Sequence, residues 1–178
     1  MKHLSLILAL AATPAFAENP EDLGTLNPDE MTWQSFTQRA ARGETGMVLC
    51  SMGYALTKSG DHASARLLFR NCAEDGYTGA MTWMSQLDNN GLGGEYNPDA
   101  AADWDRQAAE LGDPVGKFNY GLNLLRGHGV AQDKQLGRAY VDEAAEDGLE
   151  VAQRLQRANY DPNEVTPDAD EWKYAPLF

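Results

Sequence analysis

The amino-acid sequence predicts an all-α fold, a short right-handed α/α solenoid of about three helical hairpins with a capping helix at each end. Three observations lead to this fold class. A pattern of small and large apolar residues repeats along the chain with a step of 36 residues. Within each copy these residues stand three or four positions apart, which is the spacing of one helical face. No useful length of chain alternates apolar and polar residues, so we expect no β-sheet.

The clearest landmark of the repeat is a pair of small residues. Ala108-Ala109 recurs 36 residues later as Ala144-Ala145 and 36 residues earlier as Cys72-Ala73. A large apolar residue precedes each pair by four positions, and a small residue precedes that one by three, so a second helix can approach closely. These two sets are Leu68, Trp104 and Tyr140, and Ala65, Ala101 and Gly137. A glycine after each pair marks the end of the helix.

The predicted elements follow in order along the chain. A capping helix over about 28–42 begins after Asn27, with proline in its first turn. Three antiparallel hairpins follow, and then a short last helix. Their expected ranges are 47–75, 79–111 and 115–147 for the hairpins and 149–158 for the last helix. Asn97 and Asp133 are expected to cap the second helices of the second and third hairpins.

The first residues form a separate segment. A basic start, a short apolar run and an A-x-A site at Ala15 to Ala17 predict a secretory signal peptide over residues 1–17. The helical repeat domain is then expected over 18–158 and a C-terminal tail over 159–178. The apolar run is too short to cross a bilayer, which takes about 20 residues, so we expect no direct membrane insertion. The predicted location is the periplasm.

The connection "RGHGVAQD" at 126–133 admits three interpretations: a phosphate cradle, a metal loop with His128 as a ligand, or an elbow between two helices. "NGLGGEYN" at 90–97 stands at the same place in the preceding hairpin, with its first two glycines in register. This repetition favours the elbow, because glycine turns the backbone through positive φ without strain. His128 matches Leu92 and is therefore no part of the repeat.

The unit at 116–148 resembles the Sel1-like repeat, a relative of the tetratricopeptide repeat, in its G-x-G-V-x-x-D elbow, its A-x-x-aromatic spacing and its alanine pair. The second unit departs from this pattern at Ser85 and Gly94, where glycine and valine are expected, and the first unit lacks the long elbow. The resemblance covers residues 33–157. It implies the solenoid fold and a role in holding complexes together or restraining envelope sensors, as secreted bacterial members do.

Several function classes are excluded by composition and motifs. The net charge of −13 repels nucleic acid and anionic lipid. His62 and His128 belong to no H-E-x-x-H pair, and no G-x-S-x-G occurs. Two isolated histidines do not form a zinc set. We therefore expect no enzyme, no catalytic residue, no cofactor and no metal.

A calcium-binding loop is the main alternative to a protein without a metal site. "DNNGLGGEYNPD" at 88–99 partly matches the EF-hand pattern, with Asp88 and Gly93 in place. Leu92 stands where an oxygen ligand is needed, and Asp99 stands where a bidentate glutamate belongs. The alternative function that follows is a ligand- or calcium-binding accessory to an envelope enzyme.

Cys50 and Cys72 are the two cysteines of a chain that is expected in an oxidising compartment, which favours a disulfide. They fall on the two helices of the first hairpin, about one helical turn out of step. A tilt between the helices is needed to bring their Cα atoms within about 7 Å. The alternative is that Cys72 is only a small core residue, like its counterparts Ala108 and Ala144.

A binding surface is expected on the first helices, because these line the concave side of tetratricopeptide-like solenoids. The core positions expected there are Val48, Met52, Gly53, Ala80, Met84, Ser85, Gly116, Tyr120 and Gly121. The other positions form rows of aromatic anchors and hydrogen-bonding groups. The predicted binding residues are Tyr54, Trp83, Gln86, Phe118, Asn119 and Leu122. The alternative is that Trp83 and Phe118 pack between neighbouring repeats.

The tail at 159–178 either caps the last hairpin with Trp172 and Phe178 or docks a partner, and capping is favoured because these side chains would cover exposed apolar surface. The sequence as a whole predicts a non-enzymatic periplasmic scaffold or adaptor. It would bind a protein or peptide partner in the cell envelope through the solenoid surface, as an accessory subunit or regulator of an envelope complex.

Overall fold

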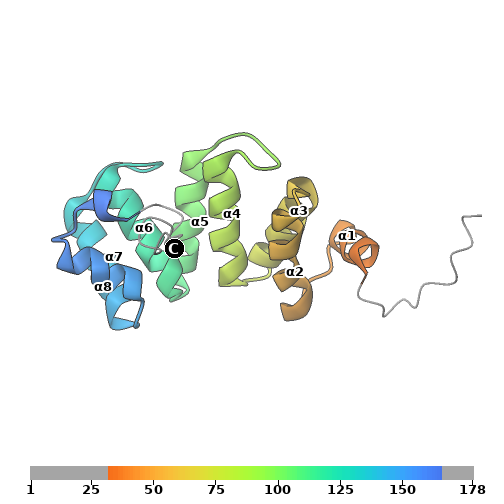
Figure 1. Ribbon diagram of the computed structural model, residues 1–178, viewed down its shortest axis with the longest axis horizontal. Coiled ribbons are helices and arrows are strands. Elements are labelled where there is room, and N and C mark those ends of the chain that lie inside the picture. Colours follow the sequence, from red (N-terminus) through yellow and green to blue (C-terminus); the bar gives the residue numbers. More distant parts are fainter. Residues whose placement is uncertain (1–31, 166–178) are drawn as a thin grey trace, which may run out of the picture. The chain divides into compact units, whose positions relative to one another are not determined.

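A computed structural model describes residues 32–165, and this segment consists of helices that pack in chain order. A first helix is followed by three hairpins, a last α-helix and a short 3-10 helix (Figure 1). They are α1 (Trp33–Ala41), α2 (Met47–Lys58), α3 (His62–Glu74), α4 (Thr78–Asn90), α5 (Pro98–Glu110), α6 (Pro114–Arg126), α7 (Lys134–Glu146), α8 (Glu150–Arg157) and η1 (Pro162–Glu164). No strand occurs in this segment, and the predicted all-α solenoid is confirmed.

Side-chain caps set the beginnings of the helices. Asn97 accepts a hydrogen bond from the first turn of α5, and Asp133 accepts two from the first turn of α7, as the sequence predicts. Thr32 forms a capping box with Ser35 and starts α1 at Trp33, which is later than the expected start near residue 28. The expected cap at Asn27 and the signal peptide over 1–17 lie outside the described residues.

Glycines hold the long elbows in place. Gly129, with φ of 65°, lies against the backbone carbonyl of Pro98 at the start of α5, where a Cβ atom would overlap the oxygen. Gly93 packs in the same way on the carbonyl of His62 at the start of α3. Each elbow therefore rests on the second helix of the preceding hairpin. The elbow interpretation of 126–133 is confirmed, and His128 Nε2 lies 2.9 Å from Asn89 Oδ1.

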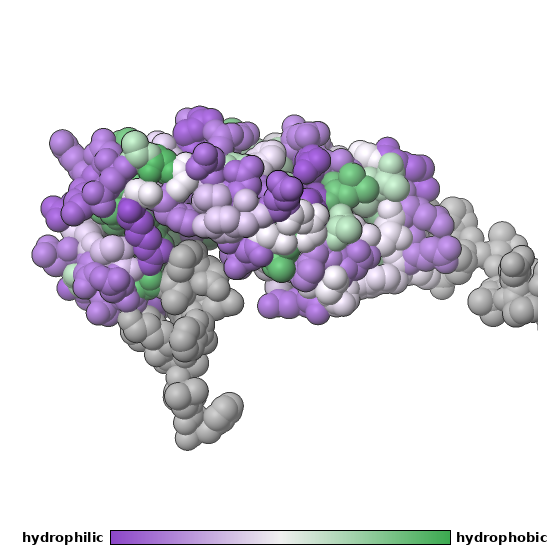
Figure 2. Space-filling model, turned by 90° about the horizontal axis from the view of Figure 1, so that it is seen from above, coloured by the Kyte–Doolittle hydropathy of each residue, from purple (hydrophilic) through white to green (hydrophobic). Residues whose placement is uncertain are grey.

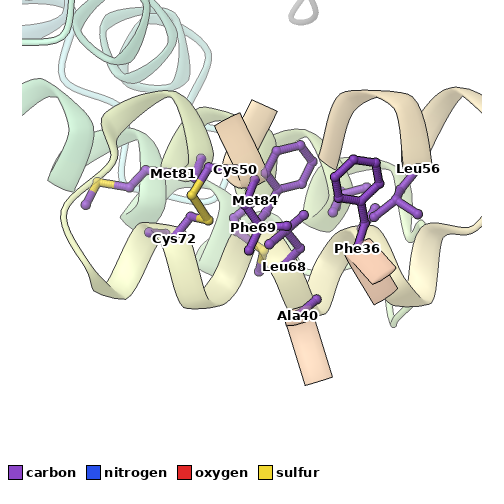
Figure 3. Close-up of a cluster of buried hydrophobic side chains, with 14 of the residues drawn as sticks. Phe36, Ala40, Cys50, Leu56, Leu68, Phe69, Cys72, Met81 and Met84 are labelled. Atoms are coloured by element: carbon purple, nitrogen blue, oxygen red, sulfur yellow. A yellow bond between two sulfur atoms is a disulfide. The ribbon is translucent and has the colours of Figure 1, made fainter. Parts of the chain in front are cut away.

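The hydrophobic core forms two clusters. The first draws on α1 to α5, and the second draws on α6 to α8 and Val165. Their largest fully buried side chains are Leu56, Leu68, Met84 and Leu87 in the first cluster, and Phe118, Leu122 and Leu155 in the second. The cysteine pair belongs to the first cluster (Figure 3).

Cys50 on α2 and Cys72 on α3 form a disulfide, with their Cα atoms 6.0 Å apart. The predicted disulfide is therefore confirmed. Cys72 is also fully buried, like Ala108 and Ala144 at the same place in the other repeats. The helix pair thus meets at a position that takes small side chains, and this proximity allows the bridge.

The prediction of a core position on the first helices is wrong for one residue, Val48. The side chain of Val48 is 60% exposed, because the buried face of α2 runs through Leu49, Gly53 and Leu56 at helical spacing. Val48 lies one position off that face. Met52 and Tyr120 are half-buried. The remaining expected core residues are buried, namely Gly53, Ala80, Met84, Ser85, Gly116 and Gly121.

The chain after α8 packs back on the last hairpin as far as Val165. Arg126 at the end of α6 donates hydrogen bonds to two carbonyl oxygens of this segment, at 2.6 and 2.7 Å, and the Val165 side chain is buried. The first part of the predicted tail at 159–178 therefore covers α6. Trp172 and Phe178, to which the capping role is assigned by the sequence, lie outside the described residues. Within 32–165, no helix is long and apolar enough to cross a membrane.

Candidate functional site

A hollow of about 370 Å³ lies between α2, α3 and the beginning of α4. It is bordered by the first helices of two neighbouring hairpins, the elements on which the sequence predicts a binding surface. The lining residues are Cys50, Ser51, Tyr54, Phe69, Tyr77, Thr78, Gly79, Ala80 and Trp83. Aromatic rings supply much of this lining, so an apolar or aromatic side chain of a ligand fits it.

Three aromatic rings form the wall of the hollow. Trp83 stacks on Phe69, with ring centroids 5.6 Å apart and an interplanar angle of 4°. Tyr54 meets Trp83 edge-on, with centroids 5.5 Å apart, and Lys58 Nζ lies 5.3 Å from the centre of the Tyr54 ring. Trp83 is partly buried against the first hydrophobic cluster, whereas Tyr54 is 50% exposed. Trp83 therefore braces the wall, and Tyr54 is the ring that a partner can cover.

The predicted binding residues on α6 do not reach this surface. Phe118 and Leu122 are 0% and 1% exposed and belong to the second hydrophobic cluster. The expectation that they face the groove with Tyr54 is wrong, because α6 supplies the largest side chains of that cluster. Gln86 and Asn119 are half-buried and do not line the hollow. The hollow thus brings together Tyr54 and Trp83 from the predicted set.

The elbow at 90–97 holds an arginine where a calcium ion would need to sit. Arg66 of α3 pairs with Asp88 at 2.5 Å and donates hydrogen bonds to the Leu92 carbonyl at 3.1 and 3.2 Å. Asp88 is the first ligand of the predicted calcium pattern, and the guanidinium already neutralises it. Calcium would have to displace this partly buried cation, so the geometry argues against a calcium loop.

The face seen in Figure 2 is mostly hydrophilic, and its hydrophobic residues gather in small separate patches. This face therefore lacks the large apolar area that the subunits of obligate complexes bury against each other. Recognition by a surface of this kind depends on local anchors rather than on extended apolar contact.

Neither a family model nor a curated protein matches the chain, but solved structures do. A protective antigen of uropathogenic Escherichia coli, displaying an SLR fold, has 29% identity and a TM-score of 0.60 over 67% of this chain and 26% of its own. A Sel1 repeat protein from Oxalobacter formigenes has 19% identity and a TM-score of 0.61 over 79% and 58%. Cysteine rich protein B of Helicobacter pylori has 18% identity and a TM-score of 0.55 over 68% and 90%.

These neighbours share one fold with the repeat seen here, and the E. coli protein shares sequence as well. The chain has the fold of Sel1-like repeat proteins. It spans only about a quarter of the E. coli antigen and just over half of the Oxalobacter protein, so their complete activities do not transfer to it.

The second Sel1-like repeat contains a buried polar cluster that the sequence analysis missed. The Asp105 carboxyl on α5 is 1% exposed. It accepts hydrogen bonds from Ser85 Oγ at 2.7 Å, Asn123 Nδ2 at 3.0 Å and Asn119 Nδ2 at 3.2 Å. Three polar side chains from α4 and α6 thus converge on one acid and link the second hairpin to the third.

The departure of Ser85 from the Sel1-like pattern explains why this cluster fits. The counterparts of Asp105 one repeat away are the buried apolar residues Phe69 and Val141. The counterpart of Ser85 in the first repeat is Gly53, where a Cβ atom would overlap the Phe69 ring. Asp105 is smaller than its counterpart Phe69 and therefore leaves room for the Ser85 side chain. The signal that could have revealed the cluster is therefore an acid at an apolar repeat position.

Burial raises the pKa of the Asp105 carboxyl to about 7, because desolvation penalises its charged form. The hydrogen bonds from Ser85, Asn119 and Asn123 favour the charged form and offset only part of this effect. The carboxyl therefore titrates near neutral pH. It does not line the hollow, and a perturbed carboxyl suggests catalysis only where it opens into a cleft. Its role is structural.

Proposed function

We propose that this Sel1-like repeat protein is a non-enzymatic scaffold or adaptor, which binds a segment of a protein partner in the hollow between α2 and α4. The observation that carries the proposal is the half-exposed Tyr54 ring, held at the edge of the hollow by the Trp83 and Phe69 stack. An exposed aromatic ring with a fixed orientation loses little conformational entropy on binding, which makes it a suitable anchor.

The proposed location is the periplasm, where the partner would belong to a cell-envelope complex and this protein would act as an accessory subunit or regulator. The Cys50–Cys72 disulfide supports an oxidising compartment, and the signal peptide predicted over residues 1–17 supports export.

Partner capture from envelope extract tests the proposal, with Tyr54→Ala as the variant and Tyr96→Ala as its matched control. Both tyrosines are exposed, by 50% and 60%, but Tyr96 does not line the hollow. The captured partner should bind Tyr54→Ala more weakly by about 2 kcal/mol or more and should bind Tyr96→Ala as it binds the wild type. Isothermal titration with the purified partner gives the affinities.

Thermal melts of the same variants decide whether Tyr54 acts in binding or in folding. Tyr54→Ala should melt close to the wild type, because half of its side chain is already in water. Equal capture by all three proteins would show that the partner binds elsewhere. A large loss of stability in Tyr54→Ala, with affinity unchanged in the folded fraction, would make the ring a packing element instead.

A further inference from the structure

A second hollow, of about 430 Å³, lies between α3, the elbow at 90–97 and the beginning of α5. We call it the arginine hollow, and it is lined by Arg66, Arg70, Met84, Asp88, Gly93, Gly94, Glu95, Asn97, Ala100 and Trp104. None of these residues lines the hollow of Tyr54 and Trp83. The volume is at the small end of the range for ligand sites, so the arginine hollow can take a small molecule.

Arg70 on α3 supplies this hollow with an unpaired cation. The side chain is exposed, and within residues 32–165 it forms no ion pair. Its counterpart one repeat later, Arg106, pairs with Asp103 and Glu110 of its own helix, each at 2.6 Å. Glu74 stands four residues after Arg70 on the same helix, but the Arg70 side chain lines the arginine hollow instead of pairing with it. The guanidinium therefore remains available to an anion.

The other charged side chains of the arginine hollow are one ion pair and one acid. Arg66 and Asp88 pair with each other, and their side chains are 12% and 7% exposed, so their charges cancel. Glu95 in the elbow is exposed and has no ion pair within the segment that the structure describes. An anionic ligand would thus be attracted by Arg70 and repelled by Glu95, and hydrogen bonds to the ligand decide the balance.

Two further lining side chains carry N–H donors that have no acceptor. The Asn97 side-chain oxygen caps α5 by accepting a hydrogen bond from Ala100 N at 3.1 Å, while its NH₂ group donates to nothing in 32–165. The Trp104 indole N–H, which can only donate, also lacks an acceptor among these residues. Trp104 packs partly buried against the first hydrophobic cluster and gives the hollow an apolar wall. Unused donors beside an aromatic ring suit a ligand that has both acceptor oxygens and an apolar group.

We propose that the arginine hollow binds a small carboxylic acid that carries an aromatic or other apolar group. The carboxylate accepts a charge-assisted hydrogen bond from Arg70 and a second hydrogen bond from Asn97, while the apolar group packs against Trp104. This inference goes beyond the proposed function and does not depend on it, because the two hollows share no residue.

Three small probes test this chemistry by heteronuclear NMR of the indole N–H signals, with Trp104→Phe to assign the signal of Trp104. Phenylacetate has both the ring and the carboxylate, phenylacetamide keeps the ring without the charge, and acetate keeps the charge without the ring. Phenylacetate should shift the Trp104 signal in a saturable titration. The other two probes should bind about tenfold more weakly or not at all, since each lacks one half of the interaction.

Charge-neutralising variants locate the contact. Arg70→Gln should weaken phenylacetate about tenfold and should melt like the wild type, because the side chain is exposed. Arg157→Gln is the matched control: Arg157 is also exposed and without an ion pair in 32–165, but it does not line the arginine hollow. Glu95→Gln should strengthen binding, because it removes the one uncompensated negative charge of the lining.

The outcomes separate this inference from the proposed function. Equal binding of phenylacetamide, or unchanged affinity in Arg70→Gln, would overturn the recognition of a carboxylate. Weaker binding in Glu95→Gln would contradict the role assigned to the charges, and no saturable shift with phenylacetate in the wild type would overturn the site itself. Tyr54→Ala should bind phenylacetate as the wild type does, since Tyr54 does not line the arginine hollow, so each hollow can fail without the other.

Discussion

Asp105 makes the stability of this protein depend on pH in an unusual direction. Its pKa is raised from the usual 3.8 to about 7 in the folded chain, chiefly by desolvation. An acid whose pKa is higher in the folded state binds its proton more tightly there, so protonation favours folding. This contribution to stability is fully present below pH 3.8 and is lost as the pH rises through about 7.

The size of the effect follows from the difference between the two pKa values. One pKa unit corresponds to about 1.4 kcal/mol, so the full difference amounts to about 4 kcal/mol. Between pH 8 and pH 5 the folded chain gains about 3 kcal/mol from this group, because at pH 5 the carboxyl is protonated when folded but mostly ionised when unfolded. A gain of that size is a substantial part of the stability of an ordinary domain.

Urea unfolding followed by circular dichroism, repeated between pH 5 and pH 8, measures this dependence. Asp105→Asn removes the titrating proton and should flatten the gain of about 3 kcal/mol, while other groups affect both proteins alike. Asp99→Asn, an exposed acid in the first turn of the same helix, should retain the wild-type slope. Parallel pH dependence in wild type and Asp105→Asn would refute the account of this buried carboxyl.

Three further outcomes are expected. Cys50→Ser/Cys72→Ala should lower the free energy of unfolding by about 3 kcal/mol, given the 22-residue separation of the cysteines; an unchanged urea midpoint would contradict this. Gly129→Ala should destabilise the protein by several kcal/mol, because its Cβ meets the Pro98 carbonyl. Gly112→Ala, with positive φ but open space, should cost only about 1 to 2 kcal/mol in urea unfolding, and equal costs would refute the packing argument. Truncation after Asn159 should lower the melting temperature, since it removes the segment bonded to Arg126; an unchanged melt would exclude a capping role.

The repeat alone determined the helices and their pairing, and it put the two cysteines on one hairpin. Small residues such as Ala108 and Ala144 recur at a constant step, and helix caps such as Asp133 act within one turn of chain. Interactions of this kind are local, so a pattern of three- and four-residue offsets is enough to reveal them.

Only the tertiary structure decided which positions beside the predicted core face are covered by a neighbouring element. Trp83 and Tyr54 meet at the hollow, whereas Phe118 and Leu122 on α6 are enclosed in a core cluster, although the repeat places Leu122 in the same row as Tyr54. Asp105 shows the same limit, because its environment depends on side chains from two other helices. The burial of a residue depends on every element packed around it. A repeating sequence specifies which face of a helix turns toward the core, but not which further positions the neighbouring helices cover.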